Sequence, residues 1–337
     1  MLRSLYAGIS GMKVNQQKLD IIANNIANVG TTAFKSSRVR FQDMVSQSMT
    51  DPSSSSTNTG GVNGKQIGLG VQVAGIDTMV GQGMMQPTSR NLDVAMDGEG
   101  YLMVGKGPVP DANATAVTLL DKKNTIVDTN KMEISYTRDG ALTLDDKGNL
   151  LNSDGLRVLG YAVSDGTQSS LKYTGGVPTS NYVNGNGTLT ADKTALIPLV
   201  IPESIDVSGT ADKIKTFSIE KDGTIKAVLN SGKVSVLGQI AMASFKNPAG
   251  LKKVGGNLLK NTSNSGDAVV RSGIGTAPAD DNSGSYGDML SGMLEMSNVD
   301  LAEQFTDMIV ASRAFQAMGK TITTGDEILQ DIIGLKR

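Results

Sequence analysis

The sequence contains no cysteine, no histidine and no tryptophan among its 337 residues. Without cysteine no disulfide bond can form, and the redox compartment cannot be inferred from cysteine usage. Zinc and the softer transition metals lose their usual ligands. Nucleophilic catalysis by a Ser-His-Asp triad or a Cys-His pair is excluded. We therefore expect no such metal centre and no cofactor.

Strong charge and long apolar runs are also missing. The formal net charge is -2, from 31 basic and 33 acidic residues, so there is no electrostatic case for binding nucleic acid or an anionic membrane. No apolar run approaches the roughly 20 residues that a membrane span needs. Residues Met1–Ser10 include one arginine but no sustained apolar core, so we expect no cleaved secretory signal.

A long amphipathic pattern is present at each end of the chain. Residues Met1–Val29 and Asp300–Ile333 contain no proline, and their apolar residues recur at alternating steps of three and four, which is the spacing of a coiled-coil seam. A single amphipathic helix cannot bury its own stripe, so these two must cover each other or be covered by neighbouring molecules. The residues that we expect to mediate coiled-coil pairing and polymerisation are Leu2, Leu5, Ile9, Met12, Leu19, Ile22, Ile26, Leu301, Phe305, Met308, Phe315, Ile322, Leu329 and Ile333.

Polar residues mark both helix boundaries. Asp300 followed by Glu303 predicts an N-terminal cap for the second helix. Asn24, Asn25 and Asn28 lie close to the end of the first helix, although asparagine is a mediocre helix former. They indicate either amide hydrogen bonding at an interface or fraying of the helix into a loop.

Between the two ends, the apolar period changes to two, as expected for β-strands. Asp-Gly dipeptides flanked by β-type residues predict tight hairpin turns. They occupy residues 97–98, 139–140, 154–155, 165–166 and 222–223. The predicted fold is therefore multidomain α+β, with a terminal α-helical coiled-coil domain and a central all-β region rich in antiparallel hairpins.

Composition and pattern also predict the domain boundaries. Residues 1–30 and 298–337 form the paired helices, and residues 31–70 and 273–297 are linkers. Residues 71–163 and 194–272 form the all-β core. Residues 164–193, which are rich in Gly, Ser, Thr and Asn, form a small surface insertion or outer subdomain.

No motif completes a catalytic constellation. The stretch Gly60–Gln66 resembles a phosphate-binding loop, but its spacing is one residue short and Gln66 stands where a serine or threonine is needed. Paired carboxylates such as Asp145 and Asp146 could perform acid–base chemistry, yet no partner motif accompanies them. We therefore expect that the protein is not an enzyme.

Five stretches resemble, in family order, the axial proteins of the bacterial flagellum, the rod and hook family. The first combines LYAGISG (residues 5–11) with IANNIANVGTTAFK (22–35). The others are QPTSRNLDVAMDGEGYLMV (86–104), YTRDGALTLDDKGNLLNSDGLRVLGY (136–161), GQIAMASFKNPAGLKKVGGNLLKNTSNSG (238–266) and LEMSNVDLAEQFTDMIVASR (294–313). Because they touch both ends of the chain, the resemblance is global.

Within this family, Phe41–Met44 and Gly60–Val71 resemble hook subunits more than distal-rod subunits. The resemblance implies a homopolymer, the flexible tube that transmits motor torque to the filament. The distal rod is the alternative, because the insertion at residues 164–193 is small for the outer domain of a hook. Phe41 and Val45 resemble the F-x-x-x-apolar export element of such proteins.

The resemblance also implies partners and a location. The partners are the distal rod, the hook cap, the hook–filament junction proteins and the flagellar type III export apparatus. The location is the flagellum outside the cell, reached without a cleaved signal peptide. Two readings from other classes stay open: a secreted adhesin with a coiled-coil stalk, and a carboxylate-based glycosidase on the β domain.

Overall fold

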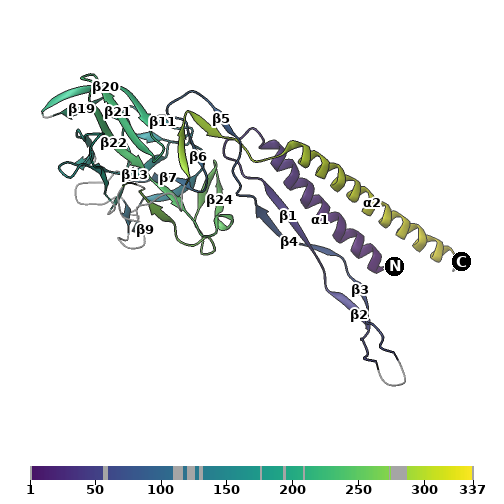
Figure 1. Ribbon diagram of the computed structural model, residues 1–337. Coiled ribbons are helices and arrows are strands. Elements are labelled where there is room, and N and C mark those ends of the chain that lie inside the picture. The colour runs from purple at the N-terminus through teal and green to yellow at the C-terminus, as the bar shows by residue number, and fades with distance from the viewer. Residues whose placement is uncertain are drawn as a thin grey trace. The chain divides into compact units, whose positions relative to one another are not determined.

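The computed structural model describes residues 2–55, 60–108, 117–119, 126–128, 132–174, 177–192, 195–207, 209–272, 274 and 287–335. The chain divides into two compact units (Figure 1). Unit 1 comprises Met1–Gly30, Lys35–Gly81 and Asn298–Arg337, and unit 2 comprises Thr31–Phe34 and Gln82–Ser297. Unit 1 therefore brings together the two ends of the chain, which are far apart in sequence.

Unit 1 contains two long helices and a β-ribbon. The helices are α1 (Leu2–Ala27) and α2 (Leu301–Gly334), and Figure 1 shows α1 between α2 and the ribbon. In the ribbon, β1 (Ser37–Asp43) pairs antiparallel with β4 (Val71–Thr78), and β2 (Ser46–Thr50) pairs with β3 (Lys65–Gly68). The predicted cap is confirmed, since the Asp300 side chain accepts hydrogen bonds from the backbone N–H groups of Ala302 and Glu303.

Both predicted linkers were wrong for much of their described length. Residues 31–70 contain β1, β2 and β3, and the strand at residues 71–78 belongs to unit 1 instead of the β core. The second linker contains β27 (Asp288–Ser291) and β28 (Met293–Glu295), which pair with strands of unit 2. The polar sequence SQSMT of β2 is exposed throughout, so it carries no apolar alternation to reveal a strand. Residues 273 and 275–286 lie outside the described part.

Unit 2 is built on a large antiparallel sheet. Its main path runs β19-β20-β21-β22-β13-β7-β10-β25-β24. These strands are β19 (Ser204–Val207), β20 (Thr210–Ile219), β21 (Thr224–Leu229), β22 (Val234–Ile240), β13 (Arg157–Tyr161), β7 (Tyr101–Lys106), β10 (Glu133–Thr137), β25 (Leu258–Lys260) and β24 (Lys252–Gly255). Strands that pair off this path are β8 (Val117–Leu119), β9 (Ile126–Asp128), β11 (Thr143–Leu144), β12 (Leu150–Leu151), β18 (Ala195–Pro198), β23 (Met242–Ser244) and β26 (Val269–Arg271).

Shorter pairings complete unit 2. They join β5 (Met85–Pro87) to β28, β6 (Val94–Asp97) to β27, β14 (Val163–Ser164) to β17 (Thr190–Ala191), and β15 (Leu171–Thr174) to β16 (Val177–Ser180). A single turn of 3₁₀-helix spans Pro248–Gly250. The α+β class and the antiparallel character that the sequence predicts are therefore confirmed.

The central strand β7 is buried on both of its faces. Leu102 and Val104 lie in one apolar cluster, whereas Tyr101 and Met103 lie in a second. Because successive side chains of a strand point to opposite faces, one run of apolar residues supplies both clusters. In the second cluster the ring of Phe245 meets Tyr101 and Tyr136 edge-on.

Residues 164–193 contribute buried side chains to unit 2. Leu171 packs in a cluster with Val200, and Val183 packs with Val163 and Val236. Ser170 is also buried. The described part of this segment is therefore built into the β domain, although its composition predicted a small surface insertion or outer subdomain.

The Asp-Gly dipeptides divide into two groups. Gly155 and Gly223 have positive φ, and each turn joins two strands that pair with each other, β12 with β13 and β20 with β21. The turn at Gly166 also has positive φ and closes on a bridge between Ser164 and Ser169. The hairpins predicted at residues 97–98 and 139–140 were wrong, because β6 pairs with β27 and β10 pairs with β7 and β25. The sequence predicts a turn at each of these two dipeptides, but it does not predict which strand pairs with β6 or with β10.

A buried ion pair ties the end of unit 2 to its sheet. Arg138 Nε lies 2.8 Å from Glu295 Oε2, and the two side chains are only 5% and 0% exposed. Arg138 Nη2 also donates to the carbonyls of Met96 and Gly98, and the backbone N–H of Gly83 donates to Glu295 Oε1. Removing one partner would leave the other charge buried without compensation.

We predict that Glu295→Gln lowers the free energy of unfolding of unit 2 by about 3–5 kcal/mol, because Arg138 loses its counter-ion. Glu203→Gln is the matched control. It removes the partner of Lys213 from a pair whose side chains are 85% and 76% exposed, so it should cost less than about 1 kcal/mol. Denaturant unfolding followed by tyrosine fluorescence measures both. Equal effects of the two substitutions would contradict the assignment.

Candidate functional site: the terminal helix pair

The two terminal helices run antiparallel and approach closely through glycine. A Cβ added to Gly11 would lie 3.2 Å from the Met318 sulfur, and one added to Gly8 would lie 3.4 Å from Ile322 Cγ1. From the other helix, a Cβ on Gly325 would lie 2.9 Å from Leu5 Cδ2. The facing residues therefore rise along α1 as they fall along α2, and small residues set the distance between the axes.

The opposite flank of α1 rests on the ribbon. Val14 is buried, and the Ser10 hydroxyl accepts a hydrogen bond from the backbone N–H of Val71 at 3.4 Å. Gly70 adopts a φ of +133°, and a Cβ there would lie 2.3 Å from Ser10 Oγ. Only glycine suits this position, because a side chain would be both strained and obstructed.

Polar contacts hold the base of the helix pair, where α1 ends and α2 begins. Asn25 is 1% exposed, and its Nδ2 donates to Gln304 Oε1 at 3.0 Å and to the Ser37 carbonyl at 2.9 Å. Its Oδ1 accepts from the Ser37 backbone N–H at 3.0 Å. About two turns before Asn25 on α1, Lys18 Nζ lies 3.3 Å from Asp307 Oδ1. Of the two readings of the asparagines, Asn25 shows amide bonding at an interface, whereas Asn28 donates to Asn24 within its own segment.

The predicted seam residues of α1 occupy several environments. Ile22 is buried, and Leu5 lies against Gly325. Met12, Leu19 and Ile26 are half-buried, whereas Ile9 is exposed. The side chain of Leu2 lies outside the described part of the structure.

The predicted seam residues of α2 divide in the same way. Ile322 contacts α1 near Gly8, and Met308 and Leu329 are half-buried. The exposed members are Leu301, Phe305, Phe315 and Ile333. Four of the seven predicted residues of α2 are therefore exposed.

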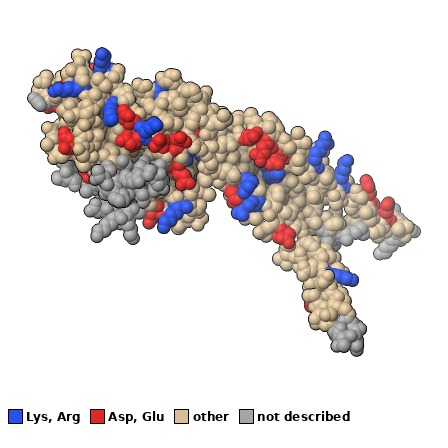
Figure 2. All heavy atoms as spheres, in the orientation of Figure 1, with Lys and Arg blue, Asp and Glu red and all other residues tan. Residues whose placement is uncertain are grey.

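Bulky apolar residues form two outward stripes on α2. The first stripe is Leu301, Phe305 and Ile309, which are four residues apart and share one face; Phe305 is 51% and Ile309 63% exposed. The second stripe is Val310, Ile328 and Ile332, separated by the small residues Ala314, Ala317 and Thr321. Contiguous exposed apolar surface of this kind marks an interaction site. Figure 2 shows large uncharged areas between the charged groups of the face that it draws.

Sequence reasoning missed the residues that make the closest helix contacts. Gly8, Gly11, Met318 and Gly325 were absent from the predicted seam, whereas amide bonding of Asn25 at an interface was one of the two readings of the sequence. On α1 the contact residues Gly8, Gly11, Lys18 and Asn25 repeat the predicted rhythm one residue earlier, although Leu5 of the predicted seam also faces α2. The available signal was the glycine and polar residues at heptad spacing, which a search for apolar side chains passes over.

The two residues expected to act in export lie on the ribbon. Phe41 is in β1 and is exposed, and Val45 lies between β1 and β2 with 81% of its surface exposed. Among the described residues, no helix has both the length and the apolar character that a membrane crossing would require.

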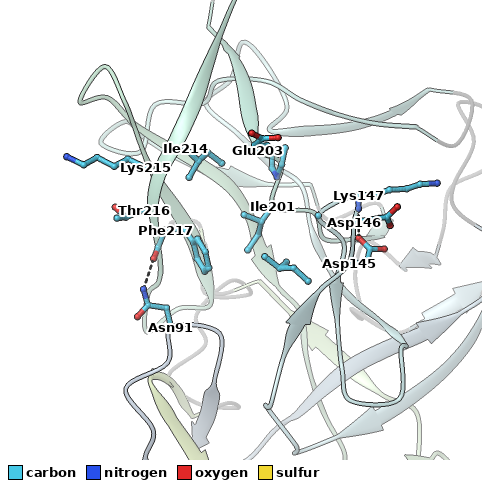
Figure 3. A pocket seen from close by; sticks show the side chains of 13 residues that line it. Asn91, Asp145, Asp146, Lys147, Ile201, Glu203, Ile214, Lys215, Thr216 and Phe217 are labelled. Atoms are coloured by element: carbon cyan, nitrogen blue, oxygen red, sulfur yellow. Dashed lines mark hydrogen bonds between the residues drawn. The ribbon is translucent and has the colours of Figure 1, made fainter.

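The carboxylate pair named in the sequence lines an open pocket of about 650 Å³ in unit 2 (Figure 3). Burial raises the pKa of Asp145, but hydrogen bonds from Asn149 and from the Lys147 backbone outweigh it and hold that pKa below its usual range. A glycosidase acid needs the opposite shift. Glu203, which also lines the pocket, bonds to the exposed Lys213. Asp145 therefore does not have the raised pKa that a glycosidase acid requires.

Three family profiles match the chain. Residues 5–35 match the flagella basal body rod protein, residues 126–227 the D1 domain of flagellar hook proteins FlgE/F/G, and residues 290–335 the C-terminal region of flagellar basal body rod FlgEFG proteins. The first and third cover most of α1 and α2, and the second falls within unit 2.

The chain is similar to curated rod and hook proteins over its whole length. It is 41% identical to the flagellar basal-body rod protein FlgG of Bacillus subtilis, with both chains fully covered. It is 31% identical to the flagellar hook protein FlgE of Borreliella burgdorferi and 30% identical to FlgG of the same organism, again with full coverage of every chain.

We predict that Gly11→Leu destabilises the helix pair by about 1–3 kcal/mol, because the new side chain must displace Met318 or push the helices apart. Gly319→Leu is the matched control on α2, where an added Cβ meets nothing within 4 Å. That control should stabilise the helix by up to about 1 kcal/mol through propensity alone. Thermal melting followed by helical circular dichroism measures both. A shift of the same sign in the two variants would refute the close approach.

Proposed function

Because the chain belongs to the family of flagellar rod and hook proteins, we propose that it polymerises through the outward stripes of α2 into the tubular axis of the flagellum. The observation that carries this proposal is the exposure of Phe305 and Ile309 on a helix whose other face is already paired with α1. Burying one such side chain contributes about 1.5–3 kcal/mol. A neighbouring copy is the partner that can cover the stripe in every subunit.

Assembly of this kind is open-ended. A contact between two different surfaces of the same chain generates a filament when its rotation does not close. An adhesin stalk would instead give a closed oligomer of fixed size. The family is one of structural proteins, and we assign the chain no enzymatic activity, in keeping with the lowered pKa of Asp145 in the carboxylate pocket.

We place the subunit in the hook, with the distal rod as the second candidate. The hook is supported by the resemblance of Phe41–Met44 and Gly60–Val71 to hook subunits. The rod is supported by the 41% identity to a protein named FlgG. The two Borreliella burgdorferi relatives, one of each name, are equally similar within one per cent and favour neither.

The proposal includes the neighbours and route of a hook subunit. The neighbours are the distal rod below, and the hook cap and hook–filament junction proteins above. The route is export through the flagellar type III apparatus without a cleaved signal peptide. Phe41 and Val45, exposed on and beside β1, are the candidate export residues.

We predict that the double substitution Phe305→Ser and Ile309→Ser raises the critical concentration for tube growth at least about a hundredfold, since each apolar contact is worth more than about 1.4 kcal/mol. The control is Gln316→Ser with Glu327→Ser, two exposed polar positions on the same helix. Sedimentation and negative-stain microscopy measure growth. The proposal fails if both double variants assemble like the parent.

Tube shape separates the two candidate positions. A hook subunit should give curved tubes that bend in solution, whereas a rod subunit should give straight, stiff ones. Cryo-electron microscopy of tubes grown from the parent chain measures the curvature. Uniformly straight tubes would move the assignment from the hook to the rod.

A further inference from the structure

The apolar seam between α1 and α2 does not specify a single register. If α2 slides by one heptad, Phe315 or Leu329 replaces Ile322 opposite Gly8, so a large apolar residue still faces glycine. Opposite Gly11, Met318 gives way to Ala311 or Gly325, both of which are small enough to fit. Those two positions therefore tolerate the slip, but Leu5, which faces Gly325 in the observed register, would face Met318 or Ile332 instead, so apolar packing selects the register only in part.

Two asparagines add to this selection. The backbone N–H of Ser37 donates to Asn25 Oδ1 at 3.0 Å, and the backbone N–H of the preceding Ser36 donates to Asn298 Oδ1 at 2.8 Å. Asn25 belongs to α1, and Asn298 lies just before the Asp300 cap of α2. Both helices are therefore held against consecutive residues at the start of the ribbon.

The remaining amide bonds depend on register as well. Asn25 Nδ2 donates to Gln304 Oε1, but a heptad slip would bring Ala311 or the non-helical Ser297 to that position, and Ala311 has no side-chain acceptor. Asn298 Nδ2 donates to the carbonyls of Met79 and Gly81, which fixes the entrance of α2 against the end of β4. A slip would therefore take Gln304 away from the buried Asn25 amide, which keeps its bonds to Ser37, and would break the bonds of the Asn298 amide to Met79 and Gly81.

We propose that Asn25 and Asn298 form a register clamp that selects one axial alignment of the terminal helices. A polar residue in an otherwise apolar seam is known to select register in coiled coils. The partly buried pair of Lys18 and Asp307 selects the register less strongly, since Asp300 would meet Lys18 in one of the slipped registers.

The clamp matters for assembly, a consequence that rests on the proposed polymerising function. A heptad slip moves the outward stripe of Phe305 and Ile309 by about 10 Å along α1. Contacts that repeat along a tube would then fall out of line with those of the next copy. The amides of Asn25 and Asn298 therefore set the position of this stripe along α1 without being part of it.

Paired cysteines can report the register directly, because the chain has no native cysteine. Gly8→Cys with Ile322→Cys reports the observed register, and Gly8→Cys with Phe315→Cys or Leu329→Cys reports the two slipped ones. In the parent background, mild oxidation should link only the first pair. In an Asn25→Leu, Asn298→Ala background, the yield of slipped over native disulfide should rise at least about tenfold.

Asn28→Leu is the matched control, because Asn28 donates to Asn24 one turn back in its own segment. It should leave the disulfide pattern of the parent unchanged. If the slipped pairs stay unlinked in the clamp variant while the native pair still forms, the inference is overturned. Should Asn25→Leu lose helical signal, Asn298→Ala alone, which changes neither helix, decides by the same criterion.

This experiment uses unassembled chains and is separate from the test of function. Failure of the parent to grow tubes would remove the proposed function and leave the clamp standing. Native-register linkage in every variant would remove the clamp and leave the function standing.

Discussion

The close approach of α1 and α2 through glycine is the constraint on which the rest of unit 1 depends. Gly8, Gly11 and Gly325 let the helices pair on a small-residue face. Because that face is used for pairing, the bulky residues Phe305 and Ile309 remain directed outward. The face of α2 that meets α1 is therefore covered within the chain, whereas its outward apolar residues stay exposed. A polymerising subunit needs such exposed surface for contacts with its neighbours.

The two units achieve order by different means. Unit 2 buries both faces of its central strand β7, so much of its apolar surface is covered within the chain. The buried ion pair of Arg138 and Glu295 adds a polar contact to this core. In the part of unit 1 that the structure describes, two helices and an antiparallel ribbon make an arrangement too thin to bury every apolar side chain. In the clamp that we propose, amide hydrogen bonds at the base of the helix pair fix the alignment of the helices, a role that the large apolar core has in unit 2. The apolar surface that assembly needs is accordingly concentrated in unit 1.

The sequence predicted the existence of both helices, the Asp300 cap and the antiparallel class, because periodicity and capping are local signals. It did not predict the paired face, since Gly8 and Gly11 contribute no apolar side chain to a pattern search. It also missed the ribbon, because β2 is polar and exposed on both faces. The turn at Asp139-Gly140 shows the same limit: the chain turns there, but the partner of β10 comes from distant β7 and β25. Local sequence patterns predict helices, strands and turns, whereas contacts between residues far apart in the sequence determine which strands pair.

We propose that neighbouring copies cover the outward stripes of α2 in the polymer. Hydroxyl-radical footprinting of the free chain and of the sedimented polymer measures this cover at Phe305 and Ile309 directly. We predict strong oxidation of both residues in the free chain and marked protection in the polymer, with Tyr136 protected equally in the two states because it is buried within unit 2. Equal oxidation of Phe305 and Ile309 in the free and polymerised forms would contradict it.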